Sequence, residues 1–128
     1  MRKKFTALAL VTIVAVGATV ASTSDLDTVH FGLVKSIPEA DSSVPSPEAV
    51  QLWFTQIPQD NSVGMRLINP AGDLLETGLI MQASEDHKHY SVQVKGKLAA
   101  GAHTVAWRGM GDDGHVVRNE FSFTVDAH

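Results

Sequence analysis

Three side chains of this sequence could bind a metal ion together: Asp113, His115 and His30. Asp113 and His115 are two positions apart, and residues i and i+2 of an extended segment point to the same side. Two imidazoles and a carboxylate suit Cu(II), which favours nitrogen and oxygen ligands, whereas calcium and magnesium prefer oxygen ligands alone. Asp-Gly-His is also a frequent turn sequence, so the tripeptide alone leaves a purely structural role open.

The N-terminal segment has the layout of a secretory signal peptide. Basic residues at positions 2–4 precede an apolar run over about 7–20, and small residues follow at Ala21 and Ser22. The apolar run is shorter than the roughly 20 residues that cross a bilayer, and no later stretch is long or apolar enough to do so. We therefore expect an exported protein without stable membrane insertion after cleavage.

The remaining chain is long enough for one domain and too short for two. We predict a signal peptide over residues 1–21, a mobile tail over 22–29 and a single domain over 30–128. Pro38 to Pro47 is rich in serine, proline and acidic residues, and we interpret it as a loop that joins the first two strands.

Composition excludes several classes of function. The chain has no cysteine, so thiolate metal sites, cysteine nucleophiles and disulfides are ruled out. Its formal charge is −4, and removal of the three basic residues at positions 2–4 leaves seven Lys and Arg against fourteen Asp and Glu, a charge near −7. An acidic surface repels phosphate backbones, which argues against nucleic acid as a partner.

Apolar residues alternate with polar ones after the signal peptide, and five prolines up to residue 70 disfavour long helices. Val50, Leu52 and Phe54, for example, share one face of a predicted strand. The pattern predicts an all-β fold, an antiparallel sandwich of about seven strands with an immunoglobulin-like appearance. The predicted strands cover residues 31–35, 50–55, 63–67, 75–80, 90–95, 104–108 and 121–125, with a turn at 69–73.

Several short motifs occur in one order along the chain. They are His30-Phe31-Gly32-Leu33, Ser36-Ile37-Pro38, Val50-Gln51-Leu52-Trp53-Phe54, Leu98 to Gly101, Val105-Ala106-Trp107-Arg108, Asp113-Gly114-His115 and Phe121-Ser122-Phe123-Thr124-Val125. In combination they make residues 30–125 resemble the CopC-type copper resistance domain.

That resemblance implies a periplasmic Greek-key β-sandwich that binds Cu(II) and carries or sequesters it in copper resistance or homeostasis. It implies His30, Asp113 and His115 as the metal ligands, and an inner-membrane copper transport protein as a partner. In the family the opening histidine commonly becomes the N-terminus, so that its amine also binds copper. Here Val29 precedes His30 and is a poor residue at a signal-peptidase site, so we expect the amine to be absent from the site.

Some members of the family hold Cu(I) through a methionine-rich loop. Met65, Met81 and Met110 are scattered here, so we predict no dedicated Cu(I) site. An alternative function is an immunoglobulin-like interaction module that has lost its metal site. We expect no catalysis, because the chain shows no Ser-His-Asp order, paired acids or phosphate-binding glycine loop, and copper monooxygenases use an N-terminal histidine.

Other residues leave alternatives open. His87 and His89 are two positions apart and could share a second metal, although an exposed strand start explains them more simply. We expect His103 and His128 to face solvent. Trp53 lies on the strand face opposite Leu52 and could either belong to a partner surface or cover the sheet.

Overall fold

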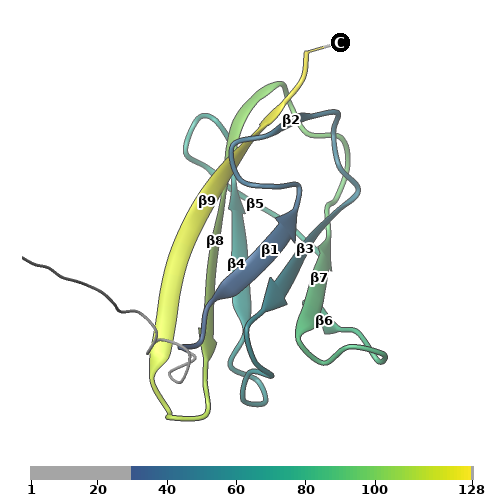
Figure 1. Cartoon of the computed structure of the whole chain (residues 1–128). Coiled ribbons are helices and arrows are strands. Elements are labelled where there is room, and N and C mark those ends of the chain that lie inside the picture. The colour runs from purple at the N-terminus through teal and green to yellow at the C-terminus, as the bar shows by residue number, and fades with distance from the viewer. Residues whose placement is uncertain (1–29, 128) are drawn as a thin grey trace, which may run out of the picture.

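The computed structural model describes residues 30–127 (Figure 1). The predicted signal peptide (1–21), the predicted tail (22–29) and His128 lie outside the described residues. The described part contains strands and no helix. The strands are β1 (Leu33–Ile37), β2 (Ser43–Val44), β3 (Ala49–Phe54), β4 (Gly64–Ile68), β5 (Leu74–Leu75), β6 (Met81–Gln82), β7 (His89–Gln93), β8 (Gly101–Met110) and β9 (Val116–Val125).

These strands form two sheets that pack face to face, which confirms the predicted all-β sandwich (Figure 1). One sheet has the strand order β1-β3-β7-β6, and the other has the order β2-β9-β8-β4-β5. Pairing is antiparallel except between β2 and β9, which run parallel. Short β2 lies inside the segment that we predicted to be a plain loop, where it adds to the edge of the second sheet.

The core lies between the sheets and follows the alternation of the sequence. Val50, Leu52 and Phe54 on β3 are at most 2% exposed, as the pattern predicted. Phe54 meets Trp107 of β8 edge-on, with ring centroids 5.6 Å apart. Burying a side chain of this size contributes about 1.5–3 kcal/mol each relative to exposure, so these contacts hold the two sheets together.

The middle of the chain differs from the prediction. A single strand over residues 75–80 was expected, but β5 ends at Leu75 and β6 begins at Met81. β5 pairs with β4 in one sheet, whereas Thr77 bridges Val94 beside β7 and β6 pairs with β7 in the other sheet. The prediction was wrong because this segment crosses from one sheet to the other, and apolar composition does not reveal a crossing.

The longest element is the hairpin of β8 and β9, in which all ten residues of each strand are paired, from Gly101↔Val125 to Met110↔Val116. Its turn, Gly111 to His115, lies at the end of the sandwich where the described chain begins (Figure 1). In the described part no helix is long and apolar enough to cross a membrane.

Candidate metal centre

The turn between β8 and β9 carries two of the predicted ligands. Gly114 N donates to the carbonyl of Gly111 at 3.0 Å, which closes the turn. Gly114 has a φ of +82°, a conformation that favours glycine over residues with a Cβ. The glycine of Asp-Gly-His therefore has a structural reason, and it places Asp113 and His115 on either side of the bend.

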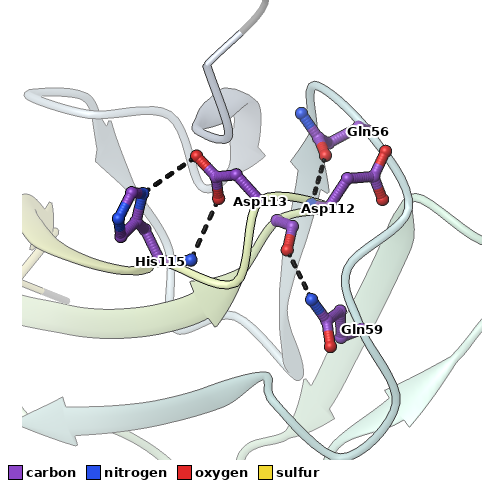
Figure 2. Close-up of polar contacts among 6 residues, drawn as sticks. Gln56, Gln59, Asp112, Asp113 and His115 are labelled. Carbon is purple, nitrogen blue, oxygen red and sulfur yellow. Dashed lines mark hydrogen bonds and ion pairs between the residues drawn. The ribbon is translucent and has the colours of Figure 1, made fainter.

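Asp113 and His115 form a hydrogen-bonded pair (Figure 2). Asp113 Oδ1 accepts from the backbone amide of His115 at 3.0 Å, and Asp113 Oδ2 lies 3.0 Å from His115 Nδ1. The backbone hydrogen bond from His115, followed by the one from its ring, lowers the pKa of Asp113 below its usual value. The carboxylate is thus ionised at neutral pH, and a ring that donates from Nδ1 leaves Nε2 free for a metal ion.

Both side chains are accessible from solvent. Their exposed fractions are 63% for Asp113 and 82% for His115. Such an exposed hydrogen-bonded pair adds little to stability. Asp113 and His115 are therefore accessible to a ligand, and a ligand that disturbs their contact would change the stability of the fold little.

Two glutamines from the connection between β3 and β4 hold the turn in place by hydrogen bonds (Figure 2). Gln56 Oε1 accepts from Asp112 N at 3.0 Å, and Gln59 Nε2 donates to the carbonyl of Gly111 at 2.7 Å. Sequence reasoning missed both residues. Nothing local marks them, since they act through a contact with a turn more than fifty positions away.

His30 is exposed and lies at the start of the described chain. Its carbonyl accepts from Thr55 Oγ1 at 2.9 Å, and the same hydroxyl oxygen accepts from Gly32 N at 3.0 Å. Thr55 N donates in turn to the carbonyl of Gly32 at 2.8 Å. The backbone around His30 is therefore fixed beside the end of β3.

Phe31 connects this segment to the turn from Gly111 to His115. It is 7% exposed and stacks on Phe54 at 5.0 Å between centroids. It also covers two glycines of the hairpin: a Cβ on Gly109 would lie 2.6 Å from the Phe31 ring, and a Cβ on Gly111 would lie 2.9 Å from Phe31 Cβ. Phe31 thus holds the backbone next to His30 at the base of the turn.

The structure brings together the segments of the three predicted ligands, but not all three side chains. Asp113 and His115 are in contact. Within residues 30–127 no group of three or more His, Cys, Asp or Glu side chains is placed so that it could hold a metal ion. The participation of His30 therefore stays a prediction.

The other histidines have separate environments. His89 opens β7, stacks on Trp53 at 4.0 Å, and its Nε2 lies 2.9 Å from Gln51 Oε1. Lys35 Nζ lies 4.4 Å from the centroid of the Trp53 ring. Trp53 therefore covers the sheet in contact with His89 and Lys35. His87 is exposed and precedes the strand.

His103 contradicts the expectation that it faces solvent, because it is fully buried. β8 begins at Gly101, two residues earlier, and the alternation of the strand turns His103 inward with Val105 and Trp107. Its Nδ1 lies 3.1 Å from the carbonyl of Gly101, and its ring stacks on Phe123 at 5.7 Å. Nε2 is buried without a hydrogen-bond partner.

Comparison with solved structures supports the fold. The chain is similar to CopC from Methylosinus trichosporium OB3b, with a TM-score of 0.69 and 28% identity, over 77% of this chain and 96% of that one. It is similarly close to PcoC, a copper resistance protein from Escherichia coli, with a TM-score of 0.68 and 26% identity, over 74% of this chain and 99% of that one.

Two proteins are similar to this chain in sequence, and one of them is also a copper resistance protein. Copper resistance protein C of Escherichia coli is 27% identical over 106 residues, which cover 75% of this chain and 81% of the relative. Protein YobA of Escherichia coli strain K12 is 26% identical over 97 residues, which cover 75% of this chain and 78% of the relative. The family model of the CopC domain matches residues 33–126, a range that includes Asp113 and His115 and begins just after His30. This chain belongs to the CopC domain family.

Proposed function

We propose that this protein binds Cu(II) in the periplasm and carries or sequesters it, with His30, Asp113 and His115 as ligands. The observation that carries the proposal is the hydrogen-bonded pair of Asp113 and His115 on a braced, exposed turn beside residue 30. Membership of the CopC family and the similarity to copper resistance proteins support copper as the metal.

The pair has two ways to serve a metal ion. If copper binds His115 Nε2, Asp113 accepts a hydrogen bond from Nδ1 on the other side of the ring and orients it, as carboxylates commonly do for metal-bound imidazoles. If copper binds Nδ1 and a carboxylate oxygen, the ring takes the tautomer with its proton on Nε2, so that Nδ1 can bind the metal. In the second case the exposed ring of His30 completes a set of two imidazoles and a carboxylate that suits Cu(II), whereas in the first case the two imidazoles are the ligands that these residues supply.

The wider assignment follows the same reasoning. We propose residues 1–21 as the signal peptide for export, 22–29 as the tail predicted from the sequence, and 30–128 as the binding domain. An inner-membrane copper transport protein is the expected recipient of the metal. We propose binding rather than catalysis, because the three ligands suffice to carry a metal ion and no residue is assigned to a chemical step.

The test is a Cu(II) titration followed by electron paramagnetic resonance on the secreted protein, with its first residue fixed by intact mass. We expect one equivalent with a tetragonal, nitrogen-containing signal. His115→Ala should weaken binding by more than about tenfold, since even residues behind a metal ligand have effects of that order. The matched control is His87→Ala, which removes an exposed histidine that we place outside the site.

Weak binding that is indifferent to His115 would overturn the proposal. The fold would then serve the alternative function of an interaction module. Loss of binding in His115→Ala but not in His30→Ala would remove His30 from the ligand set and leave the Asp113 and His115 pair as the site.

A further inference from the structure

All three arginines between residues 30 and 127 line a single groove of about 710 Å³. Arg66 comes from β4, Arg108 from β8 and Arg118 from β9, on the outer face of the five-stranded sheet. We call this feature the arginine groove. The residues that line the arginine groove do not include the turn from Gly111 to His115. Neither the family assignment nor the proposed function accounts for this groove.

The arginines are crowded and lack carboxylate partners. Arg108 and Arg118 lie directly opposite each other in the β8 and β9 ladder, where like charges destabilise a sheet. The salt bridges of the described part join Lys95 to Glu76 and His115 to Asp113, and neither involves an arginine. Glu120 also lines the groove without forming an ion pair there. The groove therefore holds three arginines against one carboxylate, and in the described part of the chain none of these arginines forms an ion pair.

The Arg108 side chain extends across β4. A Cβ on Gly64 would lie 2.9 Å from Arg108 Nε and 3.4 Å from its Cγ, so the arginine stem rests on this glycine. Gly64 is the cross-strand partner of Arg108, and Arg66 lies on the same face of β4 two residues further on. The Arg108 guanidinium thus lies over β4 at Gly64, near the position of Arg66 on the same face of that strand.

That part of β4 is an open strand edge. β5 pairs only with Leu67 and Ile68, so in the described part Gly64 to Arg66 have no strand on the side away from β8. An unpaired edge offers backbone donors and acceptors to an extended peptide. The positive charge and the open edge occur at the same place.

We propose that the arginine groove docks a short, extended, acidic segment of a partner protein. The segment lies along Gly64 to Arg66 as an added strand, and its carboxylates meet the planar guanidinium groups of Arg66 and Arg108, a geometry that permits paired hydrogen bonds. Arg118 adds to the positive potential. Residues 30–127 carry seven basic and twelve acidic side chains, so the rest of the surface repels an extended anionic surface such as a membrane and favours a compact acidic occupant.

The first experiment uses a fluorescent hexapeptide in which glutamate alternates with threonine, so that the carboxylates lie on one face when the peptide is extended. Anisotropy is measured at low ionic strength with the secreted protein. Arg66→Gln combined with Arg108→Gln should weaken binding by at least about tenfold, because charge-assisted hydrogen bonds are lost. Lys95→Gln combined with Lys97→Gln is the control with the same change of charge, and it should retain binding.

Further arms separate the alternatives. Arg108→Lys keeps the charge but loses the planar fork, and should weaken binding less than the double variant. A peptide with alternate N-methylated amides should bind more weakly if it joins the strand edge. Thermal unfolding of every variant checks that the fold is intact, and His115→Ala should leave peptide binding unchanged, which separates this groove from the copper site.

Three results would overturn the proposal. One is a lysine-for-glutamate peptide that binds as well as the acidic one. Another is equal weakening in the lysine control variant. The third is a preference for inorganic phosphate or for vesicles with anionic lipid, measured by displacement of the peptide, which would assign the groove to a phosphate group instead.

Discussion

Phe31 rests on the backbone of Gly109, so closely that a Cβ at position 109 would lie 2.6 Å from two atoms of the phenylalanine ring. This contact joins the segment that carries His30 to the hairpin that carries Asp113 and His115. Absence of a side chain at position 109 is therefore a requirement for assembly of the candidate metal centre.

Gly109→Ala should displace Phe31 and destabilise the protein by about 1–3 kcal/mol, the usual cost of an added group in a packed core. Because His30 adjoins Phe31, Cu(II) affinity should fall as well. Urea unfolding and copper titration measure the two effects. Gly32→Ala is the control, since a Cβ there would meet no atom within 4 Å, and an equal effect of both variants would contradict the role given to Phe31.

Gln59→Ala should destabilise the protein by about 1 kcal/mol, because it removes the hydrogen bond to the carbonyl of Gly111. The turn should lose a brace, so copper binding should weaken by a smaller factor than in His115→Ala. Gln93→Ala on β7 changes an exposed glutamine at a distance from the turn and serves as the comparison. Unchanged stability and affinity in Gln59→Ala would show that Gln56 alone suffices to hold the turn.

The lowered pKa of Asp113 predicts a specific pH dependence. A carboxyl whose pKa is lower in the folded than in the unfolded state stabilises the fold above its unfolded pKa, and this contribution disappears as the pH falls through the folded value. Carbon NMR should therefore find the midpoint of Asp113 below the ordinary carboxyl range. In His115→Ala the midpoint should rise only partway, because the backbone hydrogen bond from residue 115 remains; a midpoint that does not move would contradict the ring contact.

His103→Leu should change the free energy of unfolding by less than about 1.5 kcal/mol, the range of swaps that roughly conserve core volume. Leucine loses the contact of Nδ1 with the carbonyl of Gly101, but it also removes Nε2, a buried polar atom without a hydrogen-bond partner, so the two effects oppose each other. Copper stoichiometry and the resonance signal should be unchanged. Loss of copper binding in a folded His103→Leu protein would place this histidine in the site and require a different ligand set.

His89→Ala should leave copper binding at one equivalent. The ring of His89 already stacks on Trp53 and lies within hydrogen-bond distance of Gln51, so a metal ion would have to displace both contacts. Intact mass under non-denaturing conditions counts the bound ions. A second equivalent that disappears in this variant would revive the prediction of a shared site at His87 and His89.

The fold could be predicted from the sequence wherever local alternation decides it. Val50, Leu52 and Phe54 needed only their two-residue period to be placed in the core. The crossing between β5 and β6 was not predictable in this way, because the apolar residues there serve two sheets in turn. His103 was misplaced because the strand was predicted to begin only at residue 104, whereas β8 begins at Gly101 and its two-residue period turns His103 inward.

In the candidate site, too, the local contacts could be predicted from the sequence and the tertiary contacts could not. Asp113 and His115 are neighbours in sequence, so their contact follows from a local turn. Gln56 and Gln59 became visible only through the tertiary contact between the end of β3 and the turn. The position of His30 depends on Phe31 and the glycines beneath it, a match of shapes between distant segments that no motif records.

The paired length of β8 and β9 has a consequence for the order of events during folding. Only the short stretch from Gly111 to His115 has to close for this ladder to start, so the loss of chain entropy is small and the hairpin can form early. Docking of Phe31 instead joins segments at opposite ends of the domain, and it has to await the completed sandwich. With the ligand set that we propose, a folding chain would present Asp113 and His115 first and gain His30 last, so that full affinity for copper would report that the molecule has finished folding.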